Sequence, residues 1–162
     1  MTIILVGMPG CGKSVIGFGL SKKLNMEFID TDTLIERNEK RTITEIFAQN
    51  GEEYFRNIET DILKSVIDKD AVISTGGGIV VRQENIDLLK QSKAKVIFID
   101  RKTEDILSTM RAGNRPLLKD NTDRIYRLYE ERYNRYCDAA DIRVTNDTTK
   151  QDVLNKIAEV IV

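Results

Sequence analysis

The residues best suited to chemistry form one octapeptide near the N-terminus, Gly7 to Ser14 (GMPGCGKS). It matches the pattern G-x-x-x-x-G-K-[ST] at every fixed position, and it follows an expected strand and opens an expected helix, as the pattern requires. Its glycines let successive backbone N–H groups turn toward a phosphate, and the helix N-terminus adds the positive end of its dipole. Lys13 would then reach the β- and γ-phosphates of a nucleotide, and the Ser14 hydroxyl would bind Mg²⁺. A chance Gly-rich turn is the alternative, but the context of the match favours a phosphate-binding loop.

The residues of this loop expected to bind the nucleotide are Gly10, Cys11, Gly12, Lys13, Ser14 and Val15. Cys11 allows two interpretations. A thiol beside a lysine and a helix N-terminus can be reactive. The simpler interpretation, which we prefer, is a small side chain that fits the loop.

Two carboxylates, Asp30 and Asp32, flank Thr31 at the end of a short expected strand. The carboxyl ends of strands in open α/β sheets face the ligand crevice. Beside a magnesium nucleotide, one carboxylate can hold the metal and the other can accept a proton from an attacking hydroxyl. The alternative for Asp32 is a structural N-cap of the following helix, since Asp is a favoured cap.

Three consecutive glycines, Gly76 to Gly78, follow another expected strand through Ser74 and Thr75. Proteins with this kind of phosphate-binding loop often carry a metal-binding Asp at that place. Because Ser and Thr stand there instead, we assign Mg²⁺ to Ser14 and Asp30. Consecutive glycines cost chain entropy, and they suit a place where a ligand comes close to the backbone.

Arginines supply the remaining candidates for anion recognition. Arg56 precedes Glu59 by one helical turn, so that this carboxylate can orient it. Arg115 lies in a polar stretch, about 112–121, that is typical of a mobile loop, and Arg132 lies on a tyrosine-rich helix. Any one arginine is most often a solvated surface residue. Together they could bind a carboxylate substrate and a transferring phosphoryl group.

Short apolar runs alternate with longer amphipathic patterns along the whole chain. The expected strands are Ile3 to Val6, Phe28-Ile29, Ala71 to Ser74, Val96 to Ile99 and Ile142 to Thr145. Thr42 is expected to cap a helix that stops at Asn50-Gly51, and Thr149 to cap the last helix. Strands that are apolar at consecutive positions are buried on both faces. The sequence therefore predicts one α/β domain over residues 1–162, a three-layer sandwich around a parallel sheet.

The composition excludes several kinds of site. None of the 162 residues is histidine, which rules out Ser-His-Asp triads, Cys-His pairs and imidazole metal ligands. Cys11 and Cys137 are too few for a disulfide framework or a four-thiolate zinc site. The 25 basic and 26 acidic residues give a net charge of −1, so nothing draws the chain as a whole to nucleic acid or membranes. The N-terminus has no signal-peptide pattern, so we expect a cytoplasmic protein. We also expect a monomer.

The combination of segments resembles the shikimate kinases, a family of the nucleoside-monophosphate-kinase-like P-loop group. The resemblance covers nearly the whole chain and rests on Gly7 to Ser14, Asp30-Thr31-Asp32, Phe55-Arg56-Asn57-Ile58-Glu59, Ser74-Thr75-Gly76-Gly77-Gly78, Arg115-Pro116-Leu117-Leu118, and Arg132 ahead of Tyr136. Many enzymes share the P-loop, whereas the D-T-D, F-R-x-x-E and T-G-G-G segments are much more specific.

The resemblance implies transfer of a phosphoryl group from ATP to the 3-hydroxyl of shikimate, on the route to chorismate and the aromatic amino acids. It also implies a strand order of 2-3-1-4-5, a substrate-binding region at about 31–61 and a lid at about 112–121 that closes over ATP. The residues implied to bind shikimate are Asp32, Arg56, Gly76, Gly77, Gly78 and Arg132. The catalytic residues implied are Lys13, Asp32 and Arg115, with Arg111 against the adenine.

One departure from the family and two other functions bear on this interpretation. Val15 stands where the family usually has a hydroxyl residue, so a contact to the phosphates would be lost while Ser14 keeps the metal. A kinase for another polyol acid, such as gluconate, would share the P-loop and lid but not the three specific segments together. A module that binds ATP without turnover would be expected to have lost one of Lys13, Ser14, the two aspartates or Arg115.

Overall fold

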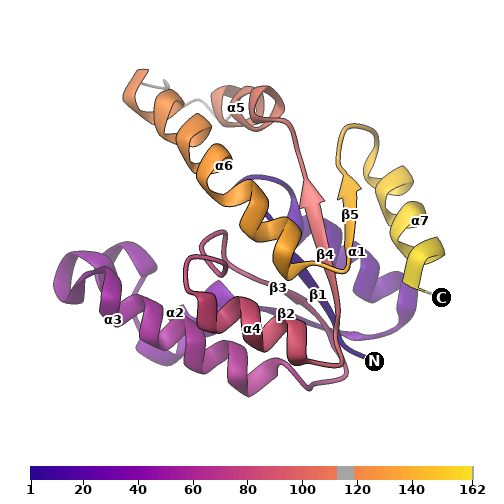
Figure 1. The fold of residues 1–162 in the computed structure, drawn as a ribbon, viewed down its shortest axis with the longest axis horizontal. Helices are drawn as coiled ribbons and strands as arrows, with labels where there is room; N and C mark the ends of the chain where they lie inside the picture. The colour runs from indigo at the N-terminus through magenta and orange to yellow at the C-terminus, as the bar shows by residue number, and fades with distance from the viewer. Residues whose placement is uncertain (113–118, 162) are drawn as a thin grey trace.

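The computed structural model describes residues 1–112 and 119–161 and shows a five-stranded parallel sheet between two layers of helices (Figure 1). The strands are β1 Ile3–Val6, β2 Glu27–Asp30, β3 Ala71–Ser74, β4 Lys95–Asp100 and β5 Ile142–Thr145. Their order across the sheet is β2-β3-β1-β4-β5, which confirms the expected order. Because every neighbouring pair is parallel, the carboxyl ends of all the strands meet at one edge.

The direction of each connection decides which face a helix covers. The helices are α1 Lys13–Leu24, α2 Thr31–Glu39, α3 Ile43–Val66, α4 Gln83–Gln91, α5 Thr103–Ala112, α6 Lys119–Ala139 and α7 Lys150–Ile161. Crossovers between parallel strands are right-handed. The β1–α1–β2 connection runs one way across the sheet, whereas those through α3, α4 and α6 run the other way. α1 therefore packs beside α7 on one face, and α3, α4 and α6 share the opposite face (Figure 1).

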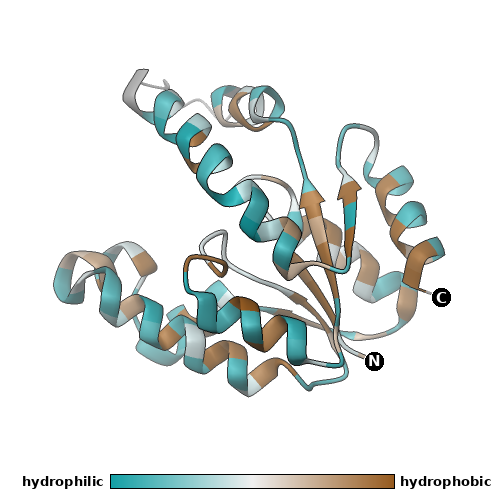
Figure 2. Ribbon diagram, in the orientation of Figure 1, coloured by the Kyte–Doolittle hydropathy of each residue, from teal (hydrophilic) through white to brown (hydrophobic). Residues whose placement is uncertain are grey.

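The core lies on both faces of the central strands. All four residues of β1 are fully buried, and so are the apolar residues of β3, as their continuous apolar sequences predict. In Figure 2 the strands at the centre of the sheet are accordingly the most uniformly hydrophobic elements. This rigid core holds the carboxyl edge of the sheet, from which the site is built.

A second, smaller group of buried apolar residues joins α2 to α3, within the segment predicted to bind substrate. Its members are Ile35, Ile46, Phe55 and Ile62. Thr42 caps α3 as predicted, since its hydroxyl accepts a hydrogen bond from the Glu45 N–H. The helix end expected at Asn50-Gly51 is a kink instead: Gly51 has a φ of 83° inside α3, and the helix then continues to Val66.

The stretch from 112 to 121, predicted to be one mobile loop, is partly helical. α5 includes Ala112, and α6 already begins at Lys119. The intervening residues, with Arg115 and the predicted lid, lie outside the described residues. Within the described ranges no helix is long and apolar enough to cross a membrane.

Candidate active site

The first segments after β1, β2 and β3 meet at the carboxyl edge of the sheet. They enclose a cavity of about 410 Å³. Its lining comprises Pro9, Gly10, Gly12, Lys13, Ser14 and Val15 from the loop after β1, Asp30 and Asp32 after β2, and Thr75 and Gly77 after β3. The structure therefore brings together the three segments that the sequence singled out separately.

The loop between β1 and α1 has the backbone that a phosphate-binding loop needs. Gly12 is the N-cap of α1 with a φ of 96°, in the left-handed region that favours glycine. The Lys13 ammonium is buried and donates to the carbonyl oxygens of Gly7 and Met8, at 2.7 and 2.9 Å. A fixed positive charge thus lies inside the loop, beside the N-terminus of α1. Cys11 is fully buried, which favours its interpretation as a packing residue.

Ser14 and Asp30 lie within hydrogen-bond distance of each other. The Ser14 hydroxyl donates to Asp30 Oδ2 at 2.7 Å, and the Ser74 hydroxyl lies 3.4 Å from the Ser14 oxygen. Mg²⁺ binds through one or two protein oxygens and fills its other positions with water and phosphate oxygens. A hydroxyl and a carboxylate at this spacing fit that requirement. The described residues hold no cluster of three acidic or cysteine side chains that would form an all-protein metal cage.

The cap of α2 is Asp30 rather than Asp32. Asp30 Oδ1 accepts a hydrogen bond from the Thr33 N–H at 3.1 Å, so this carboxylate both caps the helix and contacts Ser14. The interpretation of Asp32 as an N-cap is therefore wrong. Asp32 lies in the first turn of α2, where its carboxylate is free to face the cavity.

The surroundings of Asp32 favour its protonated form. Burial, together with the negative charges of Glu59 and Asp30, raises its pKa from 3.8 to about 6, although the Lys13 ammonium opposes the change. A carboxylate with that pKa is mostly ionised at neutral pH, yet it is far more basic than an ordinary aspartate. Those are the properties of a general base.

The three glycines after β3 leave room for close neighbours. A Cβ on Gly76 would come within 2.7 Å of Asp32 Oδ1, and one on Gly77 within 2.6 Å of the Pro9 ring. A Cβ on Gly78 would overlap the guanidinium of Arg56. None of the three has a positive φ. The backbone is thus approached closely by side chains of the chain itself, and the turn separates the loop cavity from Arg56.

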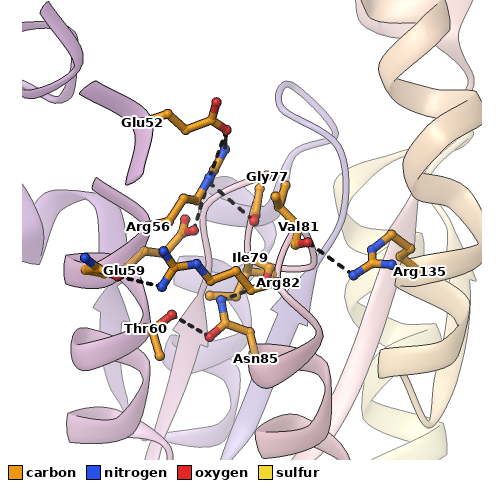
Figure 3. A network of polar contacts seen from close by, with 12 residues as sticks. Glu52, Arg56, Glu59, Thr60, Gly77, Ile79, Val81, Arg82, Asn85 and Arg135 are labelled. Carbon is orange, nitrogen blue, oxygen red and sulfur yellow. Dashed lines mark hydrogen bonds and ion pairs between the residues drawn. The ribbon is translucent and has the colours of Figure 1, made fainter. Parts of the chain in front are cut away.

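Arg56 is a buried cation whose position is fixed from within the protein (Figure 3). Its Nη1 donates to Glu59 Oε1 at 2.9 Å, and Glu59 is almost fully buried. Burial raises the pKa of Glu59, while the charge of Arg56 opposes that change. The orienting role expected for Glu59 thus agrees with the geometry.

Arg56 and Arg132, 76 residues apart in sequence, line one cavity of about 560 Å³. The other residues that line it are Phe47, Glu52, Val81, Arg124, Leu128, Glu131 and Arg135. Four arginines against two glutamates make this cavity suited to an anionic ligand.

Arg111, which was predicted to lie against the adenine of the nucleotide, is exposed in the last turn of α5.

Several contacts that hold the site together could not be predicted from the sequence, although Tyr136 belongs to one of the segments that carry the resemblance. Arg135 donates from Nε to the Val80 carbonyl at 2.6 Å, and Tyr136 donates to the Gly77 carbonyl at 2.6 Å (Figure 3 shows Arg135). Arg101 donates to the Gly10 carbonyl at 3.0 Å, and Asn146 donates to the Cys11 carbonyl at 2.9 Å. All four bind backbone carbonyls, which any sequence can offer, so only the fold reveals them.

Comparison with known proteins gives a consistent result. The family model described as shikimate kinase matches residues 9–162. A shikimate kinase of Clostridium botulinum (strain Alaska E43 / Type E3) is 47% identical over 161 residues, which cover 99% of this chain and 96% of the relative. The solved structure of an Acinetobacter baumannii shikimate kinase in complex with shikimate has a TM-score of 0.90 at 34% identity, covering 99% and 92% of the two chains. A gluconokinase from Sinorhizobium meliloti 1021 shares only the fold, with a TM-score of 0.59 at 12% identity and coverage of 99% and 94%.

Proposed function

The chain belongs to the shikimate kinase family, and we propose that it carries out that family's reaction with the residues described above. It is a phosphotransferase that phosphorylates the 3-hydroxyl of shikimate with ATP, giving shikimate 3-phosphate and ADP on the route to chorismate. One observation carries the assignment of roles: the Gly76–Gly78 turn touches Asp32 and Pro9 of the loop cavity on one side and Arg56 of the arginine cavity on the other. A substrate with a carboxylate and a ring hydroxyl fits that arrangement.

The loop after β1 binds the phosphates of ATP. Backbone N–H groups between Gly10 and Ser14 and the N-terminus of α1 face the anionic oxygens, and the Lys13 ammonium neutralises charge on the β- and γ-phosphates. Ser14 and Asp30 would hold Mg²⁺, which would supply positive charge to stabilise the negative charge that develops on the phosphate oxygens. Val15 is exposed at the start of α1 and offers no hydroxyl to the phosphates.

Asp32 is the general base. As the 3-hydroxyl oxygen forms a bond to the γ-phosphorus, the bond between that phosphorus and the β,γ-bridging oxygen breaks, and the bridging oxygen leaves as part of ADP with the bonding electron pair. The hydroxyl proton passes to the Asp32 carboxylate. A pKa of about 6 keeps Asp32 ionised at neutral pH while making it a better proton acceptor than an exposed aspartate.

The arginine cavity orients the substrate. The planar guanidinium of Arg56 suits a carboxylate, and Arg132 adds a second positive charge from α6. The backbone of Gly76 to Gly78 contacts the ring between the two ends of the site. By resemblance to the family, Arg115 stabilises the transferring phosphoryl group and Arg111 lies against the adenine.

Separate titrations with ADP and with shikimate test this division of the site. Arg56→Ala should weaken shikimate binding by about tenfold to a few hundredfold and leave ADP binding nearly unchanged, because a charge-assisted hydrogen bond is worth about 1.5–3 kcal/mol. Arg56→Lys should restore binding only in part, since an ammonium lacks the planar fork. Equal losses of ADP and shikimate affinity would show that Arg56 is structural or acts on phosphate.

A further inference from the structure

Arg56 has two kinds of carboxylate partner. Its Nη1 donates to Glu59 at 2.9 Å and to the Gly78 carbonyl at 3.4 Å, and the Glu59 side chain is 1% exposed. Its Nε and Nη2 both donate to a single oxygen, Oε1 of Glu52, at 3.4 Å each (Figure 3). The Glu52 side chain is 61% exposed. Nη1 is therefore held by a short, buried contact, whereas the edge formed by Nε and Nη2 has only long contacts with an exposed carboxylate.

The contact with Glu52 has the features of a weak ion pair. Both distances lie at the long end of the hydrogen-bond range, one oxygen serves two donors, and water screens the exposed carboxylate. Glu52 stands one helical turn before Arg56, directly after the kink at Gly51. A change of side-chain rotamer would move its carboxylate into water without uncovering buried apolar surface. The partner on this edge can therefore be exchanged at little cost.

Glu52 also lines the same cavity as Arg56 and Arg132. Under the function proposed above, the substrate carboxylate binds Arg56 in that cavity. The Nη1 group is already engaged by Glu59 and Gly78, so the Nε and Nη2 edge is the one available to a planar two-point contact. Glu52 and the substrate thus require the same edge of the same side chain.

We propose that Glu52 is a displaceable internal carboxylate, which occupies the Nε and Nη2 edge of Arg56 until the substrate carboxylate replaces it. The inference rests on the proposed role of Arg56. It makes substrate binding an exchange of one carboxylate for another, so the net gain is smaller than for an unpaired arginine. A neutral ring polyol cannot make the exchange without leaving the guanidinium edge with a poorer partner. Glu52 therefore lowers affinity for the correct substrate and selects for negative charge.

The test is calorimetric titration of the full chain with shikimate, with the methyl ester of shikimate and with ADP. Glu52→Gln should lower the dissociation constant for shikimate about three- to fivefold, the gain expected when a competing exposed ion pair is removed. Binding of the neutral ester and of ADP should not change. Glu52→Ala is a second variant without any hydrogen-bonding group, and it should show the same selective gain.

Glu53→Gln is the matched control. It removes the same charge from the neighbouring residue, which is 90% exposed and pairs with Arg82 at 4.0 Å rather than with Arg56. It should leave all three affinities unchanged. Unchanged or weaker shikimate binding in both Glu52 variants would overturn the inference and make Glu52 neutral or an orienting residue. If the wild-type chain binds shikimate and its ester equally well, the proposed role of Arg56 fails as well.

Discussion

Replacing Asp32 by Asn should make the protein more stable and nearly inactive at the same time. The substitution keeps the size of the side chain but removes the charge and the proton acceptor. In the native site that charge is unfavourable, because burial and the carboxylates of Glu59 and Asp30 raise the pKa of Asp32 from 3.8 to about 6. Function and stability therefore make opposite demands on this residue.

The size of the stability effect follows from the pKa. At about 1.4 kcal/mol per pKa unit, moving from 3.8 to about 6 corresponds to about 3 kcal/mol of destabilisation by the ionised group. Asp32 is partly exposed, and solvent screening reduces the expected value to about 1–2 kcal/mol. For a domain of this size that is an increase in Tm of about 3–6 °C.

The size of the stability difference between the two proteins depends on pH. A carboxyl group whose pKa is raised on folding binds its proton more tightly in the native state, so ionisation costs stability as pH rises from about 4 to about 6. The advantage of Asp32→Asn should be absent below pH 4, grow through this window and be complete above about pH 6.5. Thermal melts of both proteins between pH 4 and 8 measure it.

The turnover number, kcat, of Asp32→Asn is the second quantity to measure. Loss of the general base should lower kcat by about a hundredfold or more, even at saturating shikimate, with ADP affinity kept. The wild-type kcat/KM for shikimate should itself fall below about pH 6, as Asp32 of the free enzyme becomes protonated. A variant that is less stable than the wild type at pH 8, or that keeps its turnover, would refute the reasoning.

Three further substitutions probe separate parts of the site. Lys13→Ala removes the ammonium held inside the phosphate loop and should lower kcat about a hundredfold with the circular dichroism spectrum unchanged; near-normal turnover would contradict the nucleotide assignment. Gly78→Ala places a methyl group against the guanidinium of Arg56, so the KM for shikimate should rise at least tenfold in steady-state assays while the KM for ATP stays constant. Arg101→Ala frees the Gly10 carbonyl and should raise the KM for ATP about two- to fivefold without affecting shikimate, since an exposed contact of this kind contributes little. If Gly78→Ala raised the KM for ATP instead, or Arg101→Ala raised the KM for shikimate instead, the assignment of these two residues to separate cavities would be contradicted.

The fold and the phosphate loop could be predicted from local patterns. Ile3 to Val6 and Ala71 to Ser74 are continuous apolar runs, and such runs leave few choices other than strands buried on both faces. The loop could be recognised because its glycines, lysine and serine are needed at a fixed spacing along the chain. The order of the strands was expected only through the resemblance to the family.

Interactions that depend on exact backbone direction could not be predicted. Asp30 and Asp32 are the same residue type two positions apart, and only the path of the chain after β2 decides that Asp30 caps α2. The glycines from Gly76 to Gly78 could be identified as a place of close approach. That Asp32, Pro9 and Arg56 make this approach depends on tertiary contacts.

The most direct test of the central claim is phosphoryl transfer itself, followed by ³¹P NMR with the wild-type chain, ATP, Mg²⁺ and shikimate. The signal of ATP should be replaced by equal amounts of ADP and a single phosphate monoester, identified as shikimate 3-phosphate. Gluconate in place of shikimate should give no monoester, and ADP should form much more slowly when no acceptor is present. ADP release at the same rate with and without shikimate, or transfer to gluconate at a comparable rate, would contradict the account.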